Sequence, residues 1–257
     1  NLAGEVVGIA TLINFGAENI GFAVPSSTLK AILPQLRESG RVTRGYLGIE
    51  IRNLDWPAAQ SFGLDSTAGA LVQSAVEGGP AADAGIRHGD IVLRADGVEV
   101  EDTRDLIDYV SAQPPGTTVR LRVWRDGEAR VVPVELEERP SNGAVVEEPT
   151  EGEGGGIEWL GIRYQELTRE LREGHGLPES AQGVIVTRIE PDSPLADEGV
   201  QPGDLIVEVG GQPVRSAAEL EQRIGDAPAG AFLRLYVQRI NPATGQTVSF
   251  FAVVRKP

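Results

Sequence analysis

Few side chains in this sequence could carry out bond-breaking chemistry. The two histidines are His88, beside a Gly-Asp turn, and His175, in a glycine-rich loop. A Ser-His-Asp triad needs an imidazole base placed beside a nucleophilic serine, and no Gly-x-Ser-Gly motif occurs. Cysteine is absent, which removes thiolate nucleophiles, disulfides and cysteine zinc sites. We therefore expect no catalytic residue, no metal site and no cofactor, and we interpret both histidines as surface turn residues.

The composition excludes further classes of function. The net charge of -15 opposes binding to nucleic acid or to an anionic membrane, because phosphate neutralisation needs clustered Lys and Arg. No apolar run approaches the ~20 residues that span a bilayer. Hydrophobic residues make up 40% of the chain and aromatic residues 5%, which fits small cores of aliphatic side chains. We expect neither a nucleic-acid partner nor a membrane span.

An internal repeat organises the chain. Tyr46–Ile49 matches Trp159–Ile162 at an offset of 113 residues, and the offset becomes 114 after one inserted residue. The matched positions further along include Pro80 and Pro194, Gly89-Asp90 and Gly203-Asp204, and Leu106 and Leu220. Each copy spans about 95 residues, the size of a domain rather than of a stacking repeat. The sequence therefore predicts a duplicated domain.

Each copy is predicted to be mainly β with short helices, an α+β fold. Four segments of the first copy alternate apolar and polar side chains, which predicts strands with one buried face. These segments are residues 70–76, 91–95, 119–124 and 129–134. Residues 103–110 predict a short helix, capped by Asp102 or Thr103, whose apolar stripe contains Leu106, Ile107 and Val110.

Composition also divides the chain into segments. Residues 138–156 are rich in Glu, Gly and Pro, which predicts a flexible acidic linker that lets the two copies reorient independently. It separates a first domain, residues 44–137, from a second, residues 157–257. Residues 1–43 contain about two strands and one helix, too little to bury an independent core. We expect this segment to be frayed, swapped or packed opportunistically.

The helix predicted in the first segment has its own signals. Leu29, Ile32, Leu33 and Leu36 fall on one helical face, and Ser26 or Ser27 can cap the N-terminus. Pro34 predicts a kink or an early end, because proline removes a hydrogen bond and clashes with the preceding turn.

Both copies resemble the PDZ domains of bacterial HtrA proteases. The resemblance rests on Φ-Gly-Φ at Gly48 and Gly161, followed in each copy by a proline and then by Gly-Φ-x-x-Gly-Asp-Φ-Φ. It implies two partly open β-barrels in tandem. Residues 4–9 and 21–25, with the helix after them, resemble the end of the family's trypsin-like barrel. The family's nucleophile motif, His and Asp would all lie upstream of Asn1, so we expect this chain to lack the triad and to be inactive alone.

The resemblance implies a groove in each copy that holds a peptide C-terminus as an added strand. Backbone N–H groups would converge on the ligand carboxylate at a glycine, whose bare backbone allows close approach. The implied carboxylate-binding residues are Arg44, Tyr46, Leu47, Gly48 and Ile49 in the first domain, and Trp159, Leu160, Gly161 and Ile162 in the second. The implied groove helix contributes Ile107 and Val110 in the first domain, and Glu221 and Ile224 in the second. Periodicity alone leaves open which helix face meets the groove and which meets the core.

The two domains differ beside the implied carboxylate loop. Arg44 can bring positive charge to a bound carboxylate, whereas the matching position in the second copy is Ile157. We therefore expect the first domain to bind free C-termini more tightly.

The resemblance implies a function for the whole region. It would recognise substrate for, and regulate, a periplasmic HtrA-type serine endopeptidase acting in protein quality control. The implied partners are C-terminal or unfolded segments of client proteins, the protease domain of the parent chain, and further copies in a trimer or larger assembly. The alternative is a non-catalytic tandem-PDZ scaffold or adaptor, and the barrel-like segment before residue 44 distinguishes the two.

Overall fold

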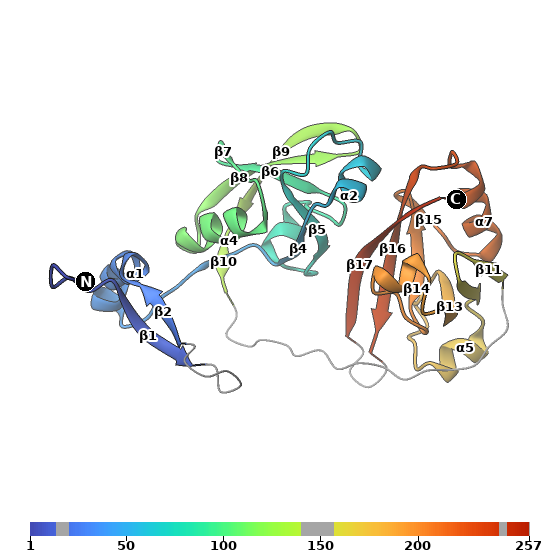
Figure 1. The fold of residues 1–257 in the computed structure, drawn as a ribbon, viewed down its shortest axis with the longest axis horizontal. Helices are drawn as coiled ribbons and strands as arrows, with labels where there is room; N and C mark the ends of the chain where they lie inside the picture. The colour runs from blue at the N-terminus through green and yellow to red at the C-terminus, as the bar shows by residue number, and fades with distance from the viewer. Residues whose placement is uncertain (14–20, 140–156, 242–245, 257) are drawn as a thin grey trace.

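The computed structural model describes residues 1–13, 21–139, 157–241 and 246–256. Along the chain it shows an N-terminal hairpin with a helix, followed by two β-rich domains that lie side by side (Figure 1). We call residues 44–139 domain 1 and residues 157–256 domain 2.

The N-terminal unit is a hairpin followed by a helix. Strands β1 (Gly8–Ile13) and β2 (Gly21–Pro25) pair antiparallel, and α1 (Ser26–Ser39) follows directly. Many of its large apolar side chains are exposed: Leu2, Val6, Val7, Ile9, Phe22, Val24, Leu33 and Leu36. So few elements leave apolar faces uncovered, since two strands and one helix do not enclose a core.

For this helix the predicted serine cap and the early end are wrong, and the alternative of a kink at Pro34 stays a prediction. Neither serine caps it: the residue before the helix is Pro25, and no side chain bonds the free amides of the first turn. The helix also does not end early, because it runs past Pro34 to Ser39. Pro34 lies on the exposed side, where solvent can satisfy the carbonyl that loses its intrahelical bond. Gly40 ends the helix in the left-handed conformation and donates its N–H to the Leu36 carbonyl.

Domain 1 is an antiparallel sheet with small helices. The sheet order is β4-β5-β6-β8-β9, with β7 beside β6, and β3 pairs separately with β10. The strands are β3 (Gly45–Tyr46), β4 (Ile49–Asn53), β5 (Ala70–Ala75), β6 (Ile91–Ala95), β7 (Val98–Glu99), β8 (Thr118–Arg125), β9 (Glu128–Glu135) and β10 (Glu137–Glu138), and the helices are α2 (Trp56–Ser61), α3 (Pro80–Asp83) and α4 (Thr103–Ala112). Leu106 and Val110 of α4 pack into the core against Val72, Val92 and other strand residues.

Domain 2 repeats this arrangement with one difference. Its sheet order is β11-β12-β13-β14-β16-β17, with β15 beside β14, so an extra strand precedes β12. The strands are β11 (Ile157–Trp159), β12 (Ile162–Glu166), β13 (Val184–Ile189), β14 (Leu205–Val209), β15 (Gln212–Pro213), β16 (Phe232–Ile240) and β17 (Thr247–Arg255), and the helices are α5 (Arg169–Gly174), α6 (Pro194–Asp197) and α7 (Ala217–Asp226). Strands β4 and β12 even share a register shift at matching positions, before Ile51 and before Tyr164.

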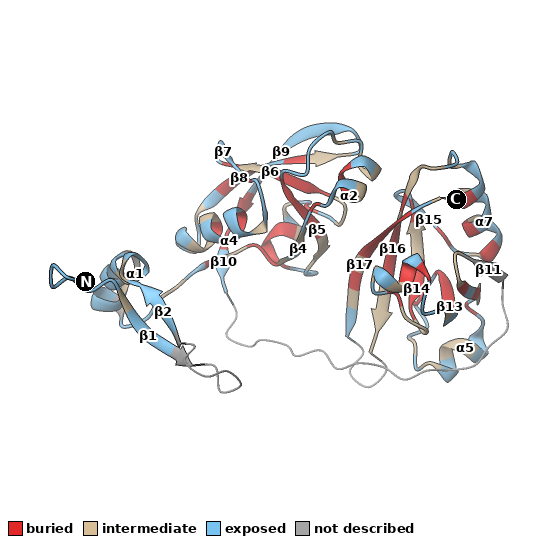
Figure 2. Ribbon diagram, in the orientation of Figure 1, coloured by how far each residue is buried: buried red, intermediate tan, exposed pale blue. Residues whose placement is uncertain are grey.

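The prediction that strands β5 and β6 bury one face is wrong. Ala70, Leu71 and Val72 are all buried, as are Ile91 and Val92. Ala70, Val72 and Val92 face the core of domain 1. Leu71 and Ile91 join a second cluster, which also contains Leu54, Ala58, Tyr236, Phe251 and Val253. The last three belong to domain 2, so β16 and β17 cover the second face of β5 and β6. Figure 2 shows buried residues on both β5 and β17.

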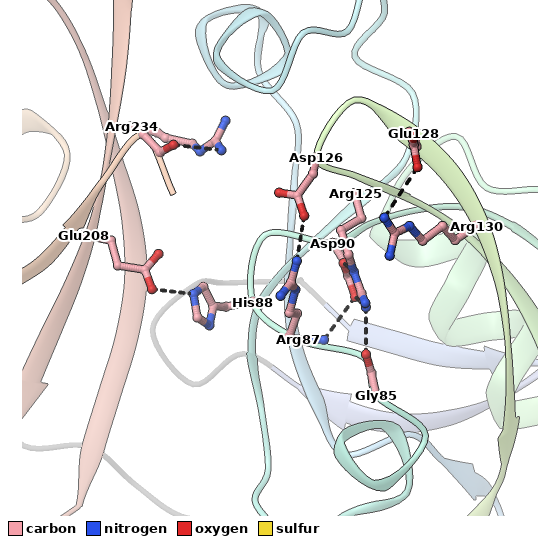
Figure 3. A network of polar contacts seen from close by, with 11 residues as sticks. Gly85, Arg87, His88, Asp90, Arg125, Asp126, Glu128, Arg130, Glu208 and Arg234 are labelled. Carbon is pink, nitrogen blue, oxygen red and sulfur yellow. Dashed lines mark hydrogen bonds and ion pairs between the residues drawn. The ribbon is translucent and has the colours of Figure 1, made fainter. Parts of the chain in front are cut away.

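The predicted independence of the two domains is also contradicted by these contacts, because the interface has polar bonds as well as apolar packing. Arg52 of β4 donates to the Phe251 carbonyl at 3.0 Å, and the Tyr236 hydroxyl donates to the Gln73 carbonyl at 3.0 Å. His88 Nε2 lies 3.1 Å from Glu208 Oε1 (Figure 3). The His88 ring also stacks on Tyr236, with 4.1 Å between the ring centroids. His88 lies in a turn, as predicted, but its side chain is only 34% exposed because it packs against domain 2, so the surface part of the prediction is wrong. Most of the predicted linker, residues 140–156, lies outside the described residues.

The repeated Gly-Asp pair is structural in each domain. Asp90 is fully buried and receives two 2.6 Å bonds from Arg125, which also donates to the Gly85 carbonyl (Figure 3). Asp204 and Arg239 repeat this arrangement at 2.7 and 2.8 Å. A paired guanidinium offsets the cost of burying a carboxylate. The turn expected from the Gly-Asp motif is present in both domains. Asp90 binds Arg125 of β8, and Asp204 binds Arg239 of β16.

Candidate ligand groove

A cavity of about 180 Å³ lies in domain 1 between the segment before β4, strand β4 and helix α4. Its lining is largely apolar: Gly45, Tyr46, Leu47, Gly48, Ile49, Ile51, Leu106, Ile107, Val110, Ser111 and Arg139. The structure therefore brings together the predicted residues 46–49 of the loop and both predicted residues of the groove helix.

The loop is fixed by close backbone packing at its start. A Cβ on Gly45 would lie 2.6 Å from Leu136 Cδ1 and 2.6 Å from the Val110 carbonyl oxygen. Such distances are shorter than van der Waals contact, so only glycine fits there. The Gly45 N–H donates to the Gln113 carbonyl at 3.0 Å. The loop is thereby attached to the C-terminal end of α4.

The carbonyls and amides of the loop have different partners. The Leu47 carbonyl accepts from Ala81 N–H at 2.9 Å, and the Gly48 carbonyl accepts from Val76 N–H at 2.7 Å. In the described part of the chain, neither the Leu47 N–H nor the Gly48 N–H has a backbone acceptor. Gly48 has φ +71, the left-handed region that glycine adopts at low cost. Two amides beside the cavity thus remain for a ligand.

Strand β4 presents an open edge next to this loop. Among the described residues it pairs on one side, with β5, from Ile49 opposite Ala75 to Asn53 opposite Ala70. Ile49 and Ile51 line the cavity while Glu50 between them is exposed, as expected for alternating side chains. A peptide added antiparallel to β4 would end beside the loop that precedes Ile49.

Helix α4 supplies the opposite wall. The Asp102 carboxylate caps it by accepting from Arg104 N–H at 2.8 Å and Asp105 N–H at 3.1 Å. Ile107 is 48% exposed and Val110 is 5% exposed, so the helix presents an open apolar residue at the cavity mouth and a buried one deeper. The question that periodicity left open is thus answered for this domain, because one helix face lines both cavity and core.

Five lining residues were not predicted: Gly45, Ile51, Leu106, Ser111 and Arg139. Ile51 was detectable, because it shares a strand face with Ile49. The sequence places Leu106 in the apolar stripe without a groove role, and Ser111 adds a hydroxyl group to the helix wall. Arg139 is the last residue of domain 1, directly after β10, and no pattern in the sequence pointed to it. Arg44, the cation that was predicted, is exposed and does not line the cavity.

The matching loop in domain 2 has a different conformation. Leu160 has φ +49 and Gly161 has φ +73, the pair of positive values that a two-residue hairpin turn of type I′ requires. The turn folds β11 back onto β12, with Ile157 opposite Tyr164 and Trp159 opposite Ile162. The prediction of an accessible strand edge beside this loop is therefore wrong for domain 2, because β11 already pairs with that edge of β12.

The groove of domain 2 is also filled from within. Tyr164, which matches Ile51 of domain 1, is 1% exposed and packs in the domain core. Burial and the nearby Glu221 carboxylate both raise the pKa of the Tyr164 phenol. Of the two predicted helix residues, Ile224 packs in the same core cluster and Glu221 is exposed. The two domains share a fold but not an open groove.

The described residues contain neither a metal-binding cluster nor a membrane-spanning helix. No group of three or more His, Asp or Glu side chains is arranged there to hold a metal ion. Of the helices in the same residues, none has the length and apolar character needed to cross a bilayer.

Comparison with known families agrees with this geometry. The family model described as PDZ domain matches residues 45–136 and again residues 159–250. The chain therefore belongs to the PDZ-domain family and contains two copies of the domain, mainly β with short helices.

Similarity to longer proteins specifies the type of PDZ protein. The chain is 37% identical over 225 residues to a probable periplasmic serine endoprotease DegP-like of Chlamydia trachomatis, covering 86% of the chain and 44% of that protein. It is also 37% identical over 232 residues to the DegP-like protein of Brucella suis, covering 87% and 43%. A solved HtrA-type protease, AlgW with tripeptide, matches with a TM-score of 0.50 and 34% identity over 55% of this chain and 48% of that one. The chain thus corresponds to the PDZ-bearing part of HtrA-type serine endoproteases and spans less than half of these relatives.

Proposed function

We propose that domain 1 captures the C-terminus of a polypeptide as an extra strand beside β4. The observation that carries the proposal is the combination of an open β4 edge, two unused amides at Leu47 and Gly48, and an apolar cavity at the same end. Main-chain bonds along β4 would supply affinity, and the amides would receive the terminal carboxylate.

The cavity defines the chemistry of the last ligand side chain. Ile49, Ile51, Ile107 and Val110 surround it, so an aliphatic residue would fit and a charged one would lose hydration without a matching partner. Burying one aliphatic side chain is worth about 1.5–3 kcal/mol. A Val, Leu or Ile terminus is therefore the expected ligand.

The region acts, in this proposal, as the substrate-recognising and regulatory part of a periplasmic HtrA-type serine endopeptidase in protein quality control. The relatives are named as periplasmic endoproteases, and the solved AlgW structure contains a tripeptide. Its partners would be exposed chain ends of client proteins, the protease domain, and further copies of the chain. The similarity to proteases along 86% of the chain favours this function over a free-standing scaffold.

Domain 2 has a supporting role in this proposal. Tyr236, Phe251 and Val253 cover the face of β5 and β6 opposite the domain 1 core, and Arg52 of β4 is bonded to the Phe251 carbonyl. The strand that receives the ligand is thus held from behind by the second domain.

Calorimetric titration of the 257-residue chain tests the proposal. A short peptide ending in Val with a free carboxylate should bind, and the same peptide ending in Asp should bind at least about tenfold more weakly. Ile107→Asp should abolish most of the binding of the Val peptide, whereas Val131→Asp, on the exposed face of β9 at 63% exposure, should leave it unchanged. Equal binding by both variants would rule out this groove as the site.

A further inference from the structure

One positively charged side chain, Arg139, lines the cavity at the end of the groove where the ligand C-terminus would lie. Among the described residues that line the cavity, Arg139 alone carries a charge. It lies outside residues 45–136, which the PDZ family model matches, and it follows β10 as the last residue of domain 1. We propose that Arg139 is the residue of domain 1 that selects for a free terminal carboxylate, a proposal that rests on the function given above.

The backbone places Arg139 at the carboxylate end of the groove. Strand β10 pairs with β3, with Glu137 opposite Tyr46 and Glu138 opposite Gly45. The Arg139 N–H continues this pairing by donating to the Arg44 carbonyl at 3.2 Å. Arg139 is thereby held beside the start of the loop that carries the free amides, and not beside the far end of β4 at Asn53.

The orientation of a bound peptide makes this the relevant end. A strand added antiparallel to β4 has its last residue next to Ile49, where β4 begins. Upstream side chains of the same peptide would lie along β4 toward Asn53. A cation next to the loop therefore meets the terminal carboxylate rather than an acidic side chain earlier in the ligand.

The Arg139 guanidinium is also available for a new partner. Within the described residues no carboxylate lies within 4.0 Å of it, whereas its neighbour Glu138 is bonded to Arg41 at 3.0 Å. Glu137 does not line the cavity. An arginine beside an apolar cavity can give a carboxylate a charged donor, in addition to the neutral amides of Leu47 and Gly48.

Arg44 and Arg139 thus have different roles. Arg44 is exposed and does not line the cavity; its carbonyl fixes the chain at Arg139. The sequence predicts that Arg44 brings positive charge to the ligand carboxylate, but Arg139 is the arginine that lines the cavity. Both residues are exposed arginines, and their backbones are hydrogen-bonded to each other. A substitution of Arg44 is therefore a matched control for the same substitution of Arg139.

The test measures a preference rather than a single affinity. Two peptides of identical sequence ending in Val, one a free acid and one a C-terminal amide, are titrated into the wild-type chain, Arg139→Gln and Arg44→Gln. An exposed ion pair changes affinity by about two- to fivefold, so Arg139→Gln should lower the acid-over-amide preference by that factor. Arg44→Gln should keep the wild-type preference, and Arg139→Lys should keep part of it. High salt should reduce the preference of the wild-type chain more than that of Arg139→Gln.

The outcomes separate this inference from the function on which it rests. If the wild-type chain binds neither peptide, the proposed function fails. If it binds both and Arg139→Gln keeps the full acid preference, the function stands and the role of Arg139 is refuted. A loss of affinity for acid and amide alike in Arg139→Gln, at an unchanged unfolding temperature, would also refute it by showing that Arg139 acts only by shaping the groove.

Discussion

Replacing Ile51 by Tyr should close the groove of domain 1 in the way that domain 2 is closed. Ile51 lines the cavity from β4, and Tyr164 occupies the matching position on β12 after the same register shift. Tyr164 is 1% exposed and packs among core residues beneath α7. In Ile51→Tyr the new ring should lie over α4 and fill the space that a ligand side chain would take.

The magnitude follows from the burial that the ligand would lose. An aliphatic side chain that no longer enters the 180 Å³ cavity forfeits about 1.5–3 kcal/mol. The dissociation constant of a Val-terminated peptide should therefore rise about ten- to hundredfold. Stability should change little, because Ile51 is only half-buried and tyrosine is favourable in a strand.

Fluorescence anisotropy with a labelled Val-terminated peptide measures this loss. Val131→Tyr, on the exposed face of β9, controls for adding an aromatic ring to a strand of the same domain. The reciprocal variant Tyr164→Ile should not create a second binding site, because β11 still covers the β12 edge. A folded Ile51→Tyr protein that binds within about twofold of wild type would show that the last ligand side chain does not enter this cavity, and would refute the reasoning.

Three further predictions concern the loop, the buried ion pair and the interface. Gly48→Val should weaken peptide binding at least about fivefold by calorimetry, because a left-handed conformation costs a non-glycine residue roughly 1–2 kcal/mol; undiminished binding would contradict a role for this loop. Arg125→Met should lower the free energy of unfolding by about 3–5 kcal/mol in urea by leaving Asp90 buried without its partner. The double variant with Asp90→Asn should recover part of that loss, and no recovery would argue against the pair. Phe251→Ala should remove about 3–5 kcal/mol of packing and increase the radius of gyration in small-angle scattering, and an unchanged radius would mean that the polar contacts hold the domains together alone.

Much of the groove was predictable because its determinants are local. Gly48 lies in a short motif that occurs in both halves. The apolar stripe with Ile107 and Val110 follows from residue spacing, whereas its role as a groove wall was implied by the resemblance to HtrA PDZ domains. The fold class and the number of domains follow from the repeat. The strands, the helix stripe and the turn glycine needed only the spacing of side chains and the permissive backbone of glycine.

The features that were mispredicted depend on contacts between distant segments. The apolar run Ile91-Val92-Leu93 is a sign of burial on two faces, but nothing local indicates that Tyr236 and Phe251 cover the second face. The position of Arg139 in the groove depends on β10 pairing with β3, which closes a loop of about 90 residues. Local pattern likewise assigns His88 to a turn without showing that a second domain packs over it.

The most instructive difference is between the two copies of the Φ-Gly-Φ motif. Gly48 and Gly161 have nearly the same φ, +71 and +73, but Leu160 also has a positive φ whereas Leu47 does not. That one change turns the loop into a hairpin, and the roughly 1–2 kcal/mol it costs a leucine is offset by three residue pairs between β11 and β12. In domain 1 the corresponding residues, Gly45 and Tyr46, pair instead with β10, which keeps them away from the β4 edge. The residue before the glycine and the strand available to pair with it therefore determine whether the edge is open, because the glycine itself allows both conformations.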